Sequence, residues 1–408
     1  MFENKTILFA LIFISTPSFS SYDPPTAAGV ASSGMAGVTI GFDDSPLAAA
    51  VNAANLSSVS SSSFEALIGG VHTKSQGNFF GETKTGAGTF PIMGLAGVYQ
   101  YDDNFILAVV ATGAGGAGTD IRGITLPLPT GSPAVKADIK SALAIFELSP
   151  AIIYRFNREL AASIQQRNIY AGYQEELKVD GVTNHKMNLS GISYSGLKIG
   201  LSYRVSDSIR LGFSYKSEVK FDLNGEGQIA SQMGTPIAPA GTDLSWRDFT
   251  LPQEIGLGLS FRLQENLLFG ADAGTRKYSA IKKRDFDIDD DLLPGNESTT
   301  DNILKMKDTP FYRLGLQLSF NESYSIRTGY GLMYNASNPD FHNPFGPPPG
   351  INHIFAIGAG RSFQTSVVNG ALVYSDAEGE ARTSFTMGKK DRYKNTMISL
   401  QTGLTYSF

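Results

Sequence analysis

Cysteine is absent from the 408-residue sequence, which excludes disulfide bonds, thiolate metal sites and cysteine nucleophiles. Charged side chains are also few, at 17% of the residues, and 33 lysines and arginines face 38 aspartates and glutamates. No stretch concentrates the positive charges in the way that a nucleic-acid surface requires. We therefore expect no nucleic-acid partner.

Metal ligands and nucleophiles are scarce as well. The sequence holds four histidines, His72, His185, His342 and His353. They lack the spacing of metal ligands, and no local signature marks a serine nucleophile. The segment DFDIDDD at 285–291 resembles the start of an EF-hand loop, but Asp290 stands where that loop needs Gly and Asn296 where it needs Glu. We expect a solvated acidic loop there, with loose divalent-cation binding as the alternative, and we expect no metal site, no cofactor and no enzymatic activity.

Long apolar runs are missing beyond the N-terminus. No stretch of 18 or more apolar residues occurs there, which excludes transmembrane helices and leaves transmembrane β-strands open. The first residues, MFENKTILFALIFISTPSFSS, place Lys5 ahead of a short apolar core and small residues behind it, which is the pattern of a secretory signal peptide. The core is too short for a membrane anchor, which needs about 20 residues. We predict a signal peptide over residues 1–20 and export of the chain.

Glycine and aromatic residues are abundant instead, with 44 Gly, 26 Phe and 17 Tyr, a mixture that suits many strands. In LKIGLSYRV, at 197–205, apolar side chains alternate with Lys, Gly, Ser and Arg, and this period of two predicts a strand. The same alternation recurs in SIRLGFSYKSEVKFDL, EIGLGLSFRL, FYRLGLQLSF, SYSIRTGYGLMY and MISLQTGLTYSF. The apolar face would be the core of a soluble sandwich or the lipid-facing surface of a membrane barrel, and the period does not separate the two.

The lengths of the connections favour the barrel. Six short polar turns recur, namely YDDNF, RFNREL, RVSDSI, RLQENL, SFNESY and RSFQTS. Seven longer polar connections lie between them, around residues 74–88, 122–136, 175–194, 225–245, 284–306, 336–350 and 377–392. Six short and seven long connections join fourteen strands, and their strict alternation is typical of outer-membrane barrels with tight periplasmic turns and long outside loops. We therefore predict an all-β fold, a 14-stranded antiparallel transmembrane β-barrel over residues 61–408, in the cell outer membrane of a Gram-negative bacterium.

Residues 21–60 break this pattern. They are rich in Gly, Ala and Ser, lack strand alternation and precede the first predicted strand. Small side chains would allow the segment to fold back into the lumen as a plug, whereas a disordered periplasmic tail is the alternative. We predict an N-terminal hatch over residues 21–60.

Four stretches, in this order and spacing, carry a family resemblance: GMAGVTIGFDDSPLAAAVNAANLSSV, GLSYRVSDSIRLGFSYKSEVKFDLNGEG, LPQEIGLGLSFRLQENLLFGADAGTRKYSAI and DTPFYRLGLQLSFNESYSIRTGYG. They resemble the FadL family of outer-membrane transporters for long-chain fatty acids and other hydrophobic compounds. The resemblance implies a fourteen-stranded barrel that is closed by a hatch and works as a monomer. The family's Asn-Pro-Ala hatch signature corresponds to Asn52, Ala53 and Ala54, so the fixed φ of proline is lost here. Asn52 is either a ligand contact or a turn former whose side chain bonds to the backbone.

The same resemblance implies a route for the cargo. Fatty acids or hydrocarbons would be captured in an apolar groove between outside loops near residues 175–194 and 225–245, pass to a lumenal site above the hatch, and leave sideways through a kink in strand three. The partners would be hydrophobic small molecules, outer-membrane lipid and lipopolysaccharide, and the barrel-assembly machinery. A general or polar-solute porin, and a surface protein such as an adhesin or receptor, are the alternative functions.

The third predicted strand contains ATGAGGAGTD, in which Gly113, Gly115 and Gly118 spell the G-x-G-x-x-G of a nucleotide-binding loop. That loop requires a helix to follow within a βαβ unit, and another predicted strand follows here. Gly113, Gly115 and Gly116 would instead relax the strand, so that it kinks inward and interrupts its ladder. In the FadL family a kink in this strand makes the lateral opening. Close packing of side chains or of the hatch against a glycine-rich wall is the simpler alternative.

Overall fold

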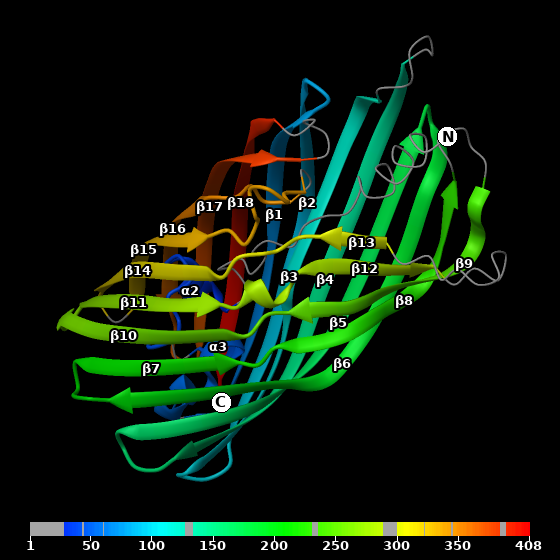
Figure 1. The fold of residues 1–408 in the computed structure, drawn as a ribbon. Helices are drawn as coiled ribbons and strands as arrows, with labels where there is room; N and C mark the ends of the chain where they lie inside the picture. The colour runs from blue at the N-terminus through cyan, green and yellow to red at the C-terminus, as the bar shows by residue number, and fades with distance from the viewer. Residues whose placement is uncertain are drawn as a thin grey trace.

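The computed structural model describes residues 28–42, 45–59, 61–126, 134–230, 236–288, 300–321, 323–343, 346–383 and 389–408. Within them the chain forms a closed antiparallel sheet around a short N-terminal segment of helical turns (Figure 1). β1 (Ser63–Phe79) pairs with β2 (Glu82–Gln100) on one side and with β18 (Lys390–Ser407) on the other, and this closes the barrel. The signal peptide predicted over residues 1–20 lies outside the described residues.

The remaining strands are β3 (Phe105–Leu126), β4 (Val135–Arg155), β5 (Leu160–Val179), β6 (Val182–Arg204), β7 (Ile209–Lys216), β8 (Val219–Ala230), β9 (Pro236–Leu251), β10 (Glu254–Gln264), β11 (Leu267–Arg276), β12 (Lys283–Ile288), β13 (Thr300–Ile303), β14 (Thr309–Phe320), β15 (Tyr324–Tyr334), β16 (Ile351–Ser362) and β17 (Ser366–Arg382). A single 3₁₀ turn, η3 (Tyr278–Ala280), lies between β11 and β12. Four long strands are broken into the pairs β7/β8, β9/β10, β11/β12 and β13/β14, so these segments make a fourteen-stranded barrel wall. The predicted fold class and strand number are confirmed.

The turns follow the predicted plan at one end of the barrel, where all six short connections join neighbouring strands. At the other end, the long loops predicted around 74–88 and 175–194 are wrong, because the strands continue into tight hairpins. The second hairpin turns at Asp180 and Gly181, which both have positive φ (47° and 81°), as a two-residue hairpin turn requires. These strand ends extend past the apolar band of the barrel. Polar residues therefore occupy both faces of the strands, and the alternation of apolar and polar residues is lost there.

The apolar residues of the alternating strand pattern lie on the outer surface of the barrel. Large exposed apolar side chains include Leu107, Val109, Ile152, Ile164, Leu201, Leu211, Leu314, Ile326, Ile357, Leu372 and Leu400. Their chain neighbours point inward; Ser202, for example, is buried between the exposed Leu201 and Tyr203. Tyr99, Tyr101, Tyr154, Phe156 and Tyr324 are exposed beside the short turns, as an interfacial girdle requires. Among the described residues, no helix is long and apolar enough to cross a membrane.

The lumen is occupied by the N-terminal segment, of which residues 28–42 and 45–59 are described. It contains α2 (Val30–Ser33), η1 (Pro46–Ala48), α3 (Ala49–Asn52) and η2 (Ala53–Ser58). Wall glycines allow its backbone to approach closely: a Cβ on Gly212 of β7 would overlap the carbonyl of Ile40, and one on Gly329 of β15 would overlap the backbone of Met35. We call residues 28–42 and 45–59 the lumenal segment.

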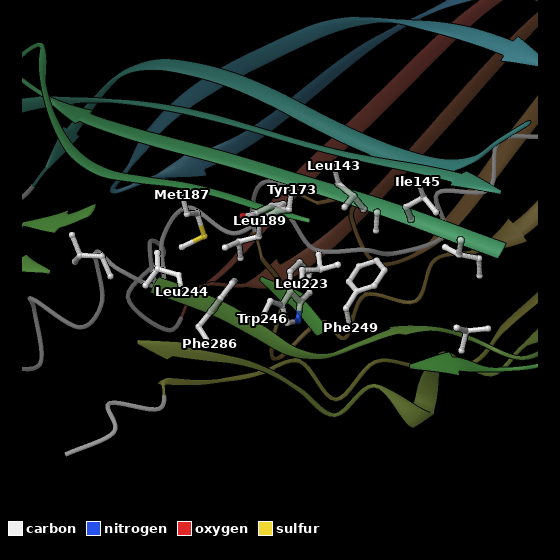
Figure 2. Packing of buried hydrophobic residues seen from close by; sticks show 14 of the residues in the cluster. Leu143, Ile145, Tyr173, Met187, Leu189, Leu223, Leu244, Trp246, Phe249 and Phe286 are labelled. Carbon is white, nitrogen blue, oxygen red and sulfur yellow. The ribbon is translucent and has the colours of Figure 1, made fainter. Parts of the chain in front are cut away.

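The external halves of β5, β6, β8 and β9 enclose an apolar cluster of their own. Figure 2 shows Tyr173, Leu189, Leu223, Trp246 and Phe249 packed together between these strands. The rings of Trp246 and Phe249 meet edge to face, with centroids 5.1 Å apart. The segments 175–194 and 225–245, expected to be groove-forming loops, therefore contribute largely paired strands and a packed core.

The proline-rich connection between β15 and β16 folds inward across the outer end of the barrel. The side chain of Asn335 donates to the carbonyl of Pro348 (2.7 Å), and that of Ser337 donates to the carbonyl of Pro347 (2.7 Å). His342 is buried against the ring of Tyr393 on β18, with centroids 4.8 Å apart. This burial lowers the pKa of His342 from its usual 6.5 to about 3.

This buried histidine predicts an acid-sensitive loop. The unfolded loop binds a proton near pH 6.5 and the folded loop only near pH 3, so the contribution of His342 to stability is complete above pH 6.5 and is lost as the pH falls from 6.5 towards 3. We expect His342→Phe, which keeps a ring but cannot titrate, to reduce the difference in protease sensitivity of this loop between pH 7 and pH 4. The matched control is His72→Phe, at an exposed histidine of β1, which should keep the wild-type difference. An undiminished acid sensitivity in His342→Phe would contradict the assignment.

Candidate functional site

Neighbouring strands β2 and β3 are joined along only part of their length. On its other side, β2 is paired with β1 from its first residue, at Phe79↔Glu82, through its external half. On its other side, β3 is paired with β4 up to its last residue, Leu126. Between β2 and β3, by contrast, the pairing runs only from Gln100↔Ile106 to Gly94↔Thr112. The ladder is therefore missing between residues 82–93 of β2 and residues 113–126 of β3. We call the part of this gap between residues 87–93 and 113–118 the window.

The two strands approach each other again above the window. A Cβ on Gly86 of β2 would lie 3.0 Å from the carbonyl oxygen of Asp120 on β3. Closer to the outer rim, the hydroxyl of Thr125 donates to Glu82 Oε1 (3.0 Å). The window is consequently bounded at both ends.

Local sequence explains why the ladder stops there. The β3–β4 register shifts between Gly113 and Gly115, which leaves Ala114 as the extra residue of a β-bulge and bends the strand. On the other side, Pro91 of β2 has no N–H to donate to a ladder. The predicted positions Gly113, Gly115 and Gly116 all lie at the rim of the window, whereas Pro91 was not anticipated, although a proline inside a strand pattern is a recognised sign of a strand edge.

A cavity of about 250 Å³ lies directly behind the window. Phe90, Met93 and Gly113 line it at the window, and Met397 of β18 and Met333 of β15 line it from the part of the wall that continues past β1. The proline-rich connection reaches it at Pro347. Its lining is mainly apolar, so it suits a hydrophobic molecule.

A second, smaller pocket of about 100 Å³ adjoins this cavity above the lumenal segment, whose Ala50 and Val51 form part of its lining. Both cavities share Ile145 of β4. The charged residues that line the smaller pocket, among the described residues, are Glu147, Arg167, Lys198, Lys216, Glu254, Arg276 and Arg313. Five of them are cationic and two are anionic, so this pocket carries an excess of positive charge.

Two carboxylates organise these cations. Glu147 is buried and accepts from Arg167 Nε (2.9 Å) and from the hydroxyl of Ser149 (2.6 Å), and it forms an ion pair with Lys198. Glu254 accepts from Arg276 Nε (2.5 Å). Glu147, Arg167 and Lys198 come from the adjacent strands β4, β5 and β6. Each side chain points into the lumen, and the strand register places all three at the same height in the barrel.

The lumenal segment is bonded to the wall on several sides. The carboxylate of Asp272 on β11 accepts from the backbone N–H groups of Thr39 (2.7 Å) and Ile40 (3.0 Å). Lys198 Nζ donates to the carbonyl of Ala50 (2.8 Å), and the hydroxyl of Ser214 donates to that of Val51 (2.7 Å). The described part of this segment is thus tied to the barrel by buried hydrogen bonds.

The predicted hatch residues lie within this packing. Asn52 Nδ2 donates to the carbonyls of Ile40 (2.8 Å) and Leu201 (3.0 Å), and its Oδ1 accepts from the N–H of Ala54 (3.1 Å). Asn52 therefore makes the backbone contacts of a turn former, and Ala53 and Ala54 are fully buried beside it.

The acidic segment at 285–291 is described only at its start. Asp285 accepts from Lys283 Nζ (3.2 Å), and Asp287 forms an ion pair with Arg247 of β9. Asp289, Asp290 and the rest of the predicted loop lie outside the described residues. Within the described ranges, no group of three or more His, Asp or Glu side chains is arranged to hold a metal ion.

The family comparison agrees with this architecture. The family described as outer membrane protein transport protein (OMPP1/FadL/TodX) matches residues 73–374, about three quarters of the chain. The chain belongs to this family. As a FadL-family member it is an outer-membrane β-barrel and a transporter of hydrophobic compounds, and not an enzyme.

Solved structures of FadL-family proteins share its fold. A Pseudomonas aeruginosa FadL homologue superposes with a TM-score of 0.77 at 13% identity, covering 97% of this chain and 100% of that one. The Ralstonia pickettii toluene transporter TbuX gives 0.71 at 17% identity, covering 93% and 98%. The Pseudomonas putida toluene transporter TodX gives 0.70 at 15% identity, covering 97% and 99%. No curated protein sequence matches the chain.

Proposed function

We propose that this barrel takes up long-chain fatty acids or similar hydrophobic compounds, which enter from its outer end, occupy the lumenal cavities above an N-terminal hatch, and leave sideways through the window between β2 and β3. The observation that carries the proposal is the window itself, because it combines a missing ladder with an apolar cavity of about 250 Å³ directly behind it. A hydrophobic molecule gains about 0.8 kcal/mol for each CH₂ that leaves water, so an apolar path favours it over a water-filled pore.

The lumenal segment supports a lateral exit over an axial one. Its hydrogen bonds to Asp272, Lys198 and Ser214 hold it across the lumen. A cargo that moved straight along the barrel axis would have to break these buried bonds, each of which costs about 1–3 kcal/mol when a partner is left unsatisfied. The window offers a route that leaves these hydrogen bonds intact. The hatch therefore blocks the barrel axis and directs the cargo to the window in the wall.

Capture belongs to the external half of the barrel. The residues expected to form a groove between loops form paired strands instead, and their apolar side chains, including Tyr173 and Trp246, face inward there (Figure 2). This buried apolar cluster supports the entry of hydrophobic cargo between these strands.

The charge of the smaller pocket favours an acidic amphiphile within the class of hydrophobic compounds. Five cations and two carboxylates among its described lining residues leave an excess of positive charge that favours a negatively charged head group, and the adjoining apolar cavity accepts the start of its tail. TodX and TbuX are named toluene transporters, and toluene carries no charge to place in such a pocket.

Mass spectrometry and uptake measurements test the transport function. We expect the purified protein to carry a co-purifying or added long-chain carboxylic acid, and a strain without the protein to take up less of it. Replacing Lys216 by Met should weaken binding of a fatty acid more than binding of the corresponding neutral alkane. Equal uptake in the deletion strain together with an empty purified protein would contradict the proposal, and rapid swelling of protein-containing liposomes in small sugars would favour a porin instead.

A further inference from the structure

Phe90 occupies an unusual place in the barrel wall. It lies on β2 opposite Val71 of β1, within the stretch of β2 that has no ladder to β3. Its ring reaches across to β3, because a Cβ built on Gly118 would overlap the ring atoms Cζ and Cε1 of Phe90. On its own strand, a Cβ built on Gly88 would lie 2.6 Å from the same Cζ. The ring thus lies between two glycines, one on each side of the window.

The two ends of the window differ for this reason. At its external end, the ring of Phe90 fills the space between Gly88 and Gly118. At its periplasmic end, a Cβ on Gly113 would meet no atom within 4 Å, and Met93 lines the cavity there. The window is therefore partly filled by one side chain and open beside it.

We propose that Phe90 is the specificity-determining residue of the window: its ring sets the open length of the gap between β2 and β3 and so limits the girth of the cargo that passes. The proposal rests on the lateral exit described above. Because no backbone hydrogen bond joins the strands at this level, the size of the opening depends on side chains. The ring of Phe90 lies against glycines of both strands there.

Two acids of equal head group and different girth test this role. Dodecanoic acid has a slim tail, and 12-(1-pyrenyl)dodecanoic acid ends in four fused rings. We expect Phe90→Ala to raise the uptake of the pyrenyl acid relative to dodecanoic acid by about tenfold, the low end of the discrimination that a hydrophobic site achieves. The matched control is Phe355→Ala on β16, a lipid-facing ring that is 51% exposed, and this variant should leave the ratio unchanged.

A double substitution checks that the ring of Phe90 is responsible. Gly118→Ala places a methyl group where the ring lies, so alone it should displace the ring and change the uptake ratio. In the Phe90→Ala background the ring is gone and the methyl group's remaining close neighbour is the carbonyl oxygen of Ser141, at 3.3 Å, so Gly118→Ala should have little further effect on the uptake ratio. Heat-modifiable migration on gels verifies that each variant assembles as a barrel.

The outcomes separate this inference from the proposed function. If Gly113→Trp blocks both acids while Phe90→Ala leaves their ratio unchanged, the lateral exit stands and the role of Phe90 is wrong. If Gly113→Trp blocks neither acid, the lateral exit itself is wrong and the inference about Phe90 fails with it. A raised ratio in Phe90→Ala, with no change in Phe355→Ala, supports the inference.

Discussion

Replacing Gly113 by Trp is expected to reduce fatty-acid uptake to the level of cells that lack the protein. Gly113 lies at the open end of the window and lines the cavity behind it. A Cβ at this position meets nothing within 4 Å, so a large side chain can fill the gap without displacing the wall. Uptake of a radiolabelled fatty acid by living cells measures the loss, and outer-membrane levels of the folded barrel verify assembly.

Gly97→Trp is the matched control for this variant. Gly97 lies on β2 below the window, where the ladder to β3 is intact, and its Cβ would lie 3.9 Å from Val109. The same increase in size there should leave uptake unchanged. Gly115→Val and Gly116→Val should also reduce uptake, the second by pressing on the carbonyl of Leu143, 3.0 Å from a Cβ at Gly116. Normal uptake in an assembled Gly113→Trp barrel would show that cargo leaves by another path.

Replacing Glu147 by Leu is expected to destabilise the barrel by about 3–5 kcal/mol, the usual result of removing one partner of a buried ion pair. The substitution leaves Arg167 and Lys198 buried without their shared carboxylate. Lys198 also holds the carbonyl of Ala50, so the lumenal segment should loosen at the same time. Urea unfolding in lipid vesicles, followed by the fluorescence of Trp246, the one tryptophan of the sequence, measures the change.

A double variant distinguishes the ion pair from a packing defect. Lys198→Met in the Glu147→Leu background removes one of the two buried positive charges that have lost their carboxylate, so the double variant should be more stable than Glu147→Leu alone. Additive losses in the two single variants would contradict the coupling. Ile164→Leu on β5, at a side chain of the outer wall that is 53% exposed, serves as a control and should change the free energy of unfolding by less than about 0.5 kcal/mol.

Much of the fold was predictable because the geometry of a membrane barrel imposes a regular pattern of apolar and polar residues on the sequence. The alternation of LKIGLSYRV is clear because one face meets lipid and the other the lumen, and the short turns mark one end of every pair of strands. The hairpin at 180–181 was missed because its strands leave the membrane, where both faces are polar. The dipeptide Asp180-Gly181 was the available signal, since it is a strong hairpin former.

The site was predictable only in part. Consecutive glycines stand out in a strand, so Gly113, Gly115 and Gly116 could be singled out. Phe90 could not be singled out, because no pattern in the sequence of β2 marks it. Its position across the window results from the loss of pairing between β2 and β3. The cluster around Glu147 is scattered over three strands in the sequence, and only the register of the folded barrel brings it together.

The interrupted ladder also determines at what depth the window can work. A closed barrel has no strand edges, but above the pair Gly94↔Thr112 the sheet regains two edges, which face each other across the window without a ladder. Hydrocarbon cannot satisfy the backbone groups of such edges, whereas water and lipid head groups can. The window therefore has to stand near the boundary between head groups and acyl chains. A fatty acid that leaves there can insert its tail among the lipids while its carboxylate stays hydrated.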